Sequence, residues 1–303
     1  MKAQQNIKSG KNPLRRFIKN DLSAWLLLIP SIILFYYIVW RPIGVAFGFS
    51  MFKLRGFTPT EFVWFKNYAD VMSDTDFLKT LANSFMYVFW ALIIAFPLPF
   101  FVAVLLNEMI HLKGFYKIAV YLPAVIPPIA VYMIWTLMYL PGQSGVFNII
   151  ISHLGGTPLN WLQNEKYTIP LMIIASAWHS FGSNTILYLA GLQSINNELY
   201  EACKIEGAGL RTRFRVVLLP HMAGTIMLLL VRQIIRVFQI LEMPLVMTGG
   251  GPNRASLSMA LQSYKYAFEY GQMDKGLASG VIIFFILIAL TFVYMKVEKK
   301  FSE

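Results

Sequence analysis

Charged and amide side chains interrupt a strongly apolar segment, residues 222–247, at Arg232, Arg236, Gln239 and Glu242. A charged side chain in a membrane-length apolar segment is costly and is by default a functional candidate. On a helix of about 100° per residue, the first three fall within roughly 60° of one another. Such a stripe must face a water-filled path or a partner, and not lipid. An interhelical ion pair, with Glu242 or with a second chain, is an equally good interpretation.

The preceding apolar segment, residues 169–192, has one face that carries rings and hydrogen-bonding groups. This face holds Trp178, Phe181, Thr185 and Tyr188, with Asn184 beside it. Aromatic walls with a few placed polar groups are typical of small-molecule sites, and such rings stack on the apolar side of sugars. The same pattern is also typical of helix packing, so both interpretations stay open.

The residue types indicate binding and not catalysis. The histidines are separated and lack metal-ligand spacing: His111, His153, His179 and His221. No nucleophile–base pair or set of metal ligands shares a depth in the apolar segments, so we assign no catalytic and no metal residue. The phosphate-loop pattern G-x-x-x-x-G-K-[S/T] is absent. We therefore expect no cofactor in this chain, and any ATP hydrolysis to belong to another chain.

The elements that position these residues must lie in a membrane. Of the 303 residues, 57% are hydrophobic and only 14% are charged, against about 25% charged in a soluble domain. A bilayer must therefore act as solvent for the apolar surface. The net charge of +11 comes from basic residues in short segments between apolar runs. That placement favours orientation of membrane loops over nucleic-acid binding. The single cysteine, Cys203, excludes an internal disulfide framework.

The apolar runs predict an all-α membrane protein with about six transmembrane helices. A span needs about 20 apolar residues, and internal prolines are tolerated in spans. Six stretches qualify: Ala24–Phe47, Ser84–Leu106, Ile118–Leu140, Ile169–Leu192, Met222–Met247 and Leu277–Tyr294.

The basic residues predict the orientation. The N-terminal tail carries Lys2, Lys8, Lys11, Arg15, Arg16 and Lys19 against Asp21 alone. The positive-inside rule places it in the cytoplasm. The segments around Lys113 and Lys117, Lys204–Arg215 and Lys296–Lys300 then follow on the same side. We divide the chain into a basic cytoplasmic tail (1–22), a first span with its external loop (23–80), a transmembrane domain (81–296) and a cytoplasmic C-terminal tail (297–303).

The loop between the fourth and fifth spans carries the most specific pattern. Asn196 or Asn197 can cap a short helix, which Gly207 and Gly209 can terminate. Pro220 then suits the first turn of the next helix. Without further information this would be an amphipathic loop on the membrane surface.

The residues of this loop resemble a family. Glu201-Ala202-Cys203-x-x-x-Gly207-Ala208, followed by Phe214 and Leu219-Pro220, is similar to the EAA loop of binding-protein-dependent ABC importer permeases. The resemblance covers roughly Leu81 to Lys296. Cys203 stands where the family usually has a second alanine, and Glu206 where related sugar permeases often have aspartate.

A second segment resembles the carbohydrate-importing branch, which includes maltose and multiple-sugar permease subunits. Thr248-Gly249-Gly250-Gly251-Pro252 is similar to its T-x-G-G-P signature, and we expect a tight external turn there. The branch usually has a Phe-Asp pair upstream, whereas this chain has Phe238-Gln239.

The resemblance implies a mechanism and a set of partners. The loop would be a coupling helix inserted in a groove of an ATPase, with Glu201 meeting a basic group there. The coupling-loop residues are Glu201, Ala202, Glu206, Gly207, Ala208 and Pro220. The partners would be a second permease subunit, two cytoplasmic ATPase subunits that bind ATP and Mg, and an external solute-binding protein.

The function that this resemblance implies is the membrane-spanning permease of an ATP-driven importer, not an enzyme, in a bacterial inner membrane. The substrate would be a sugar or oligosaccharide, crossing along a path formed by Trp178, Asn184, Tyr188, Arg232, Arg236, Gln239 and Glu242. The alternative is a self-contained secondary transporter of a small polar solute. Such a transporter would normally show more spans, inverted repeats or acidic residues at mid-membrane.

Overall fold

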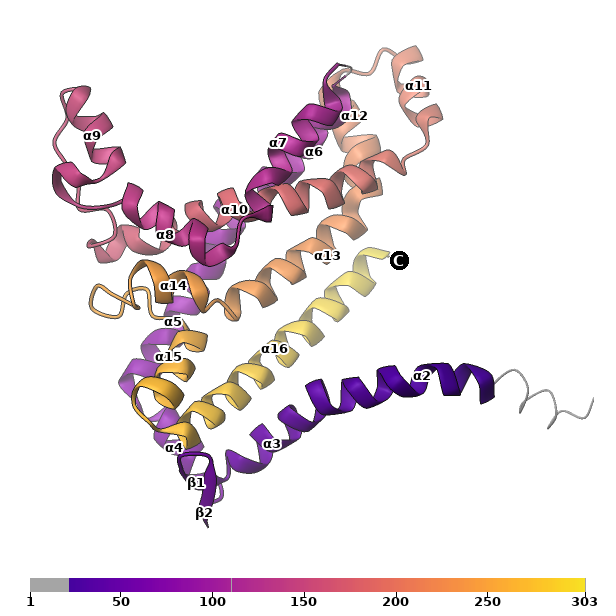
Figure 1. Ribbon diagram of the computed structural model, residues 1–303. Coiled ribbons are helices and arrows are strands. Elements are labelled where there is room, and N and C mark those ends of the chain that lie inside the picture. The colour runs from indigo at the N-terminus through magenta and orange to yellow at the C-terminus, as the bar shows by residue number, and fades with distance from the viewer. Residues whose placement is uncertain (1–21, 110, 303) are drawn as a thin grey trace, which may run out of the picture.

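A computed structural model describes residues 22–109 and 111–302, and it is almost entirely helical (Figure 1). The expected all-α membrane fold is confirmed. The basic tail expected at 1–22 lies outside the described residues apart from Leu22.

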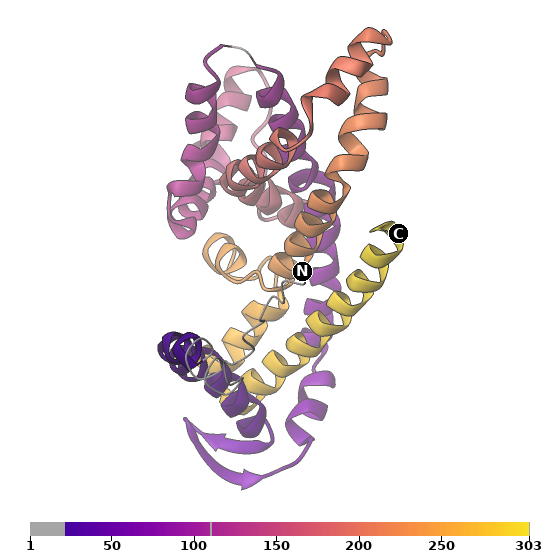
Figure 2. The same ribbon diagram turned by 90° about the vertical axis from the view of Figure 1, so that its right-hand side faces the viewer.

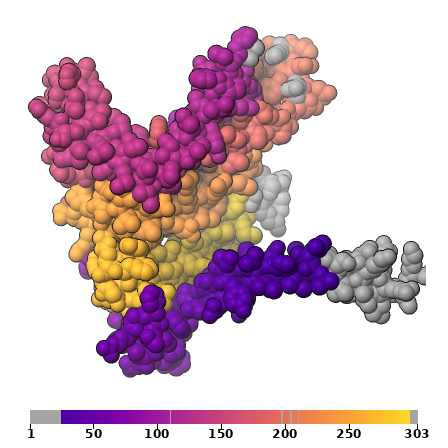
Figure 3. Space-filling view, in the orientation of Figure 1, coloured from indigo at the N-terminus to yellow at the C-terminus, as the bar shows by residue number. Residues whose placement is uncertain are grey.

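The first predicted span is one continuous helical segment. It comprises α2 (Leu22–Phe35), the π-helical turn η2 (Tyr36–Trp40) and α3 (Arg41–Phe49). Its apolar window has no residue buried within the chain, and Figure 3 shows this segment projecting away from the rest of the molecule. Its apolar side chains therefore need lipid or another subunit around them.

A small element that the sequence interpretation missed follows the first span. Strands β1 (Phe52–Arg55) and β2 (Thr58–Phe62) pair antiparallel, and helix α4 (Lys66–Met72) follows them. The buried Asn67 amide donates to the carbonyls of Ser50 and Phe52 at 2.8 and 2.9 Å. These bonds tie α4 to the junction between α3 and β1.

The second predicted span begins earlier than expected. Helix α5 (Thr75–Trp90), the π-helical turn η3 (Ala91–Ala95) and α6 (Pro97–Glu108) form one 34-residue apolar helix. It starts at Thr75 because the Asp74 side chain accepts a hydrogen bond from the Asp76 amide, which is an N-cap. Helix α16 (Met273–Ser302) confirms the last span.

The third predicted span is broken. Helices α7 (Lys113–Val125) and α8 (Pro128–Met138) are bent by 90° relative to each other. Two consecutive prolines at the break supply no amide donors. His179 of α10 contacts the break, since its Nε2 lies 3.0 Å from the Ile126 carbonyl oxygen.

The fifth predicted span differs at both ends. Its helix begins at Leu210 with α12 (Leu210–Arg213) and continues through the π-helical turn η5 (Phe214–Leu218) and α13 (Leu219–Phe238). Pro220 lies in the first turn of α13, as we expected. The helix is nevertheless continuous before it, through a turn in which the Leu219 amide donates to the Phe214 carbonyl five residues back. The helix then stops at Phe238, and a separate α14 (Glu242–Met247) follows.

The number of spans depends on how broken helices are counted. Length and composition identify four spanning helices among the described residues, or five if α7 and α8 make one. Helix α10 (Glu165–Gln193) has 29 residues but is not apolar enough to be among them. The expected six spans are consistent with this fold only when α10 is added.

Helix α10 is the centre of the packing. It contacts α5, η3, α6, α7, α8, α13 and α14. Its Gly182 lies against the α7 backbone so closely that a Cβ there would overlap the Val120 carbonyl and lie 2.9 Å from Tyr121 Cα. Two arms extend from α10, one with α8 and α9 (Val146–His153) and one with α6, α7 and the α11–α12 region (Figures 1 and 2).

Three short elements complete the fold: η4 (Gly142–Ser144), α15 (Met259–Tyr264) and η6 (Lys265–Glu269). Helix α15 packs on α16 and α5. The described ends of the chain, Leu22 and Ser302, both lie toward the right of Figure 1, opposite the β1–β2 hairpin.

Candidate functional site

A polar cavity of about 340 Å³ lies where α8, α10, α13 and α14 meet. Its hydrogen-bonding side chains come from all four helices and the α13–α14 connection. They are Tyr132, Ser176, Ser180, Gln233, Arg236, Gln239 and Glu242. A cavity of this size is at the lower end of the range for small-molecule sites, about 300–1,000 Å³.

Three of the predicted path residues line this cavity, namely Arg236, Gln239 and Glu242. The predicted geometry was wrong in one respect, because Gln239 and Glu242 lie beyond the end of α13 at Phe238. The chain turns there, and the turn brings Glu242 back to the same cavity. Arg232 is exposed on α13 and is not among the lining residues.

The arginines of α13 are not explained by pairing within the chain. Among the described residues the ion pairs are Arg213–Glu108, Arg254–Asp76 and Lys265–Glu269. Arg236 and Glu242 are both exposed in the single chain and face the open cavity. The intrachain ion pair with Glu242 is therefore not formed in this structure.

The aromatic face of α10 takes part in packing. Tyr188 is 1% exposed and lies edge-on to Phe100 of α6 at 5.3 Å between ring centroids. Trp178 is exposed and lies edge-on to Trp135 of α8 at 6.1 Å, and Asn184 is half-buried. None of the predicted α10 residues, Trp178, Asn184 and Tyr188, lines the cavity.

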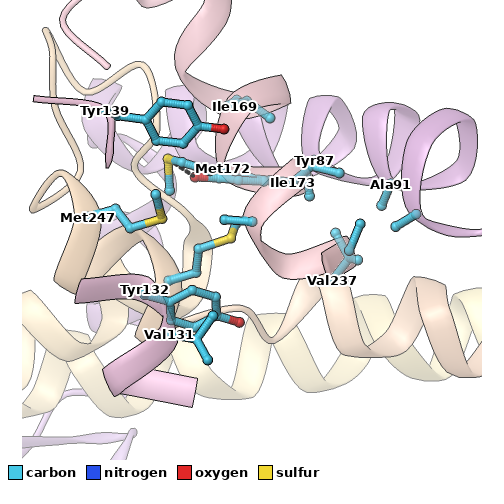
Figure 4. Close-up of a cluster of buried hydrophobic side chains, with 14 residues drawn as sticks. Tyr87, Ala91, Val131, Tyr132, Tyr139, Ile169, Met172, Ile173, Val237 and Met247 are labelled. Carbon is cyan, nitrogen blue, oxygen red and sulfur yellow. Dashed lines mark hydrogen bonds between the residues drawn. The ribbon is translucent and has the colours of Figure 1, made fainter. Parts of the chain in front are cut away.

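An apolar cluster of buried side chains adjoins the cavity (Figure 4). Tyr132, Ile173 and Val237 belong both to this cluster and to the cavity lining. The cluster packs α5, α8, α10 and α14 together, so it holds the cavity residues at fixed separation. Sequence reasoning missed Ser176 and Ser180, which lie on the cavity side of α10.

The predicted coupling loop forms a short helix, α11 (Asn197–Ile205). The Asn196 side chain accepts from the Glu198 amide at 3.0 Å and caps it. At the other end Gly207 has φ +67°, and the Ala208 amide donates to the Cys203 carbonyl at 2.9 Å. This bond and the left-handed glycine form a Schellman motif.

The two faces of α11 differ from the amphipathic pattern in the sequence. Cys203 is buried and Tyr200 half-buried against the α6–α13 packing. Leu199 and Ile205 are instead exposed, Ile205 at 87%. Glu201, Ala202, Glu206 and Gly207 are also exposed, and Ala208 is half-buried. The outer surface of α11 therefore presents apolar and acidic groups together, at the end of one arm (Figure 1).

The glycine-rich segment forms the tight turn that its sequence predicted. Gly249 and Gly250 have φ +61° and +94°. The Thr248 hydroxyl lies 2.7 Å from the Ser256 hydroxyl, and Ser256 is fully buried. These bonds close the loop on itself.

Helix α5 anchors this loop through two residues that sequence reasoning missed. The Asn83 amide donates to the carbonyls of Arg254 and Leu257 at 2.8 and 2.9 Å. The Tyr87 hydroxyl donates to the Ser256 carbonyl at 2.7 Å. The spacing of four residues places both side chains on one face of α5, which is the only sequence signal for them.

No group of three or more potential metal ligands occurs within residues 22–109 and 111–302.

Comparison with known proteins identifies the family. The family described as "Binding-protein-dependent transport system inner membrane component" matches residues 95–300. The chain is 31% identical to the trehalose/maltose transport system permease protein MalF of Thermococcus litoralis, over 91% of this chain and 93% of that one. It is 28% identical to the arabinooligosaccharides transport system permease protein AraP of Bacillus subtilis, over 94% and 91%.

The fold is also found in solved structures. A crystal structure of a bacterial ABC transporter involved in the import of alginate contains a chain with a TM-score of 0.85 to this one. The two are 22% identical, and the match covers 96% of this chain and all of the other. The family match over residues 95–300 and the 31% identity to MalF show that the chain belongs to the family of binding-protein-dependent transport system inner membrane components, which are multi-pass permease subunits.

Proposed function

We propose that this chain is a permease subunit of an ATP-driven importer that carries a sugar or oligosaccharide delivered by an external solute-binding protein. A second permease subunit and two ATPase subunits, which bind ATP and Mg, complete the assembly. The termini lie in the cytoplasm. The observation that carries this proposal is α11, a capped helix that is exposed at the tip of one arm.

The surface of α11 suits a partner and not lipid or water alone. An isoleucine that is 87% exposed at the end of the helix gains stability when a partner covers it. Glu201 and Glu206 beside it can pair with basic groups of that partner. We assign this surface to the ATPase groove. The Schellman turn at Gly207 keeps the polypeptide close to the helix, so a partner can approach it.

The cavity between α10 and α13 supports a hydroxylated substrate. Arg236, Gln233 and Gln239 offer donors, and Glu242 offers acceptors. The cavity-lining charges are exposed in the single chain, which fits a path completed by a second subunit. The relatives named for trehalose, maltose and arabinooligosaccharides support a sugar as the substrate class.

Copurification tests the assembly. The tagged chain, extracted in mild detergent, should bring down a second permease and an ATPase, and liposomes that contain this complex should take up sugar only with ATP and the solute-binding protein. Recovery of the chain alone, active in liposomes without ATP, would replace this proposal with a self-contained transporter.

A further inference from the structure

Three side chains from three separate elements meet at the cytoplasmic end proposed above. The Arg213 guanidinium of α12 donates to Glu108 at the end of α6, with 2.8 Å between Nη2 and Oε1. The same guanidinium lies over the Tyr200 ring of α11, with Cζ at 5.4 Å from the ring centroid. We name these residues, Glu108, Arg213 and Tyr200, the α6–α11–α12 cluster.

The ion pair is more than a solvated surface contact. The Arg213 side chain is only 13% exposed, while Glu108 is 48% exposed. A charge-assisted hydrogen bond with one buried partner is stronger than an exposed pair. Glu108 is the last residue of α6, where the helix dipole disfavours a carboxylate. The local helix therefore gives no reason for a glutamate there, whereas Arg213 does.

The cluster also leaves two buried polar atoms without a partner among the described residues. They are Tyr200 Oη and Arg213 Nε. Burial, and next the Glu108 charge, raise the pKa of the Tyr200 phenol, while Arg213 lowers it. The phenol therefore stays neutral, and its ring offers a π face to the cation.

The elements joined by the cluster are those that a coupling movement must link. Helix α11 carries the surface assigned to the ATPase. Helix α12 continues through η5 into α13, whose other end carries Arg236 of the cavity. Helix α6 continues through η3, which contributes Ala95 to the same cavity. We therefore expect a displacement of α11 to reach both sides of the cavity through Arg213.

We propose that Glu108, Arg213 and Tyr200 are positioning residues that transmit movement of α11 to α6 and α13. This inference rests on the coupling role proposed for α11. The ion pair fixes α12 to α6, and the cation–π contact fixes α11 to α12. Without them α11 would still meet the ATPase, but its displacement would reach α6 and α13 only through the short Glu206–Gly209 connection and the apolar contacts of Cys203 and Ala208.

The test uses the complete transporter in proteoliposomes and measures sugar uptake and ATP hydrolysis on the same preparation. We expect Glu108→Gln and Arg213→Gln to lower the sugar taken up per ATP by about tenfold, as the loss of a charge-assisted bond implies. ATP hydrolysis should persist. Tyr200→Leu should lower the same ratio to a smaller extent.

The exchanged pair Glu108→Arg with Arg213→Glu separates coupling from stability. It should restore most of the uptake per ATP that either single change removes. The matched control is Glu269→Gln, which breaks the Lys265–Glu269 pair (3.4 Å) outside the cluster and should leave the ratio unchanged. Thermal melting in detergent verifies that each variant is folded.

Two results would overturn the inference. One is a wild-type ratio of uptake to ATP in the folded single variants, and the other is an exchanged pair no better than the single changes. If the native chain itself shows no ATP-dependent uptake, the proposed function fails and the inference falls with it. The native control therefore distinguishes the two failures.

Discussion

At the scale of the residue, the backbone conformation at position 207 requires a glycine, whereas the space around it would admit a side chain. Its φ of +67° is left-handed, and nothing lies within 4 Å of where a Cβ would be. A side chain there costs about 1–2 kcal/mol through conformation alone. Gly207→Ala should therefore loosen the end of α11 and lower ATP-driven uptake by up to roughly tenfold, as measured in proteoliposomes.

Gly209 provides a matched control two residues away. A Cβ at Gly209 would likewise meet no atom within 4 Å, but the φ of Gly209 is not left-handed. Gly209→Ala should therefore keep native uptake. Equal uptake by both variants would show that the Schellman turn is not needed for coupling.

The cavity makes a prediction about Arg236 and Gln239. Each lines the cavity, and losing a hydrogen bond to a charged group costs about 1.5–3 kcal/mol. Arg236→Leu and Gln239→Leu should therefore reduce uptake kcat/KM by about 10–100-fold and about tenfold, respectively. The measurement is initial uptake against sugar concentration. Arg232→Leu is the control, because Arg232 is on the same helix but not in the lining. Unchanged kinetics in all three would remove this stripe from the path.

The sequence alone identified most cavity charges but not their geometry. Arg236 was found because a charge in an apolar segment is costly. The turn after Phe238 could not be inferred, since Gln239–Leu241 contains no proline or glycine. Ser176 and Ser180 were missed because small hydroxyls in a spanning helix carry no comparable cost. Tyr188 matched a sugar-stacking pattern, but helical spacing is the same for a ring that packs against Phe100.

At the scale of the element, Gly182 sets how closely α10 and α7 approach. An alanine Cβ there would overlap the Val120 carbonyl and lie 2.9 Å from Tyr121 Cα. These are backbone atoms of a packed helix, so they cannot move aside cheaply. Gly182→Ala should destabilise the fold by about 1–3 kcal/mol, seen as a lower melting temperature in detergent.

Gly191 of the same helix is the comparison for that prediction. Its nearest atoms are Met222 Cε and Sδ at 3.0 and 3.1 Å, which belong to a flexible side chain. Gly191→Ala should therefore cost much less than Gly182→Ala. A melting temperature lowered equally by both changes would contradict the close backbone contact of α10 with α7.

Prolines explain why the elements were only partly predictable. Pro42, Pro97 and Pro220 each follow a π-helical turn, so the helix passes through them. Pro127 and Pro128 instead end one helix and begin another at 90°. A single proline removes one amide donor, and a π-helical turn before the proline keeps the helix continuous. Two prolines in succession remove two adjacent donors, and the helix breaks there. Hydropathy is similar in all these cases and cannot tell them apart.

At the scale of the whole molecule, the chain exposes more apolar surface than water tolerates. The first span has no buried residue in its apolar window, and the windows of the other three spans are only 22–28% buried. Hydropathy therefore predicted the membrane fold well, because lipid and partner subunits take the place of a core. It could not indicate which apolar faces meet lipid and which meet the second permease, since both environments select the same side chains.

The last prediction concerns which side of the membrane each end of the molecule faces. The β1–β2 hairpin and the tip of α11 lie at opposite ends of the structure (Figure 1), and the positive-inside rule assigns α11 to the cytoplasm. Phe57 is 76% exposed at the hairpin and Ile205 is 87% exposed on α11.

In a Cys203→Ala background, a membrane-impermeant maleimide should label Phe57→Cys in intact cells. In cells that lack the ATPase subunits, which would otherwise cover α11, it should label Ile205→Cys only after permeabilisation. Ser279→Cys, at a fully buried position, should stay unlabelled in both cases. Labelling of Ile205→Cys in intact cells would reverse the orientation and place the proposed ATPase surface outside the cell, where no ATPase subunit could couple to it.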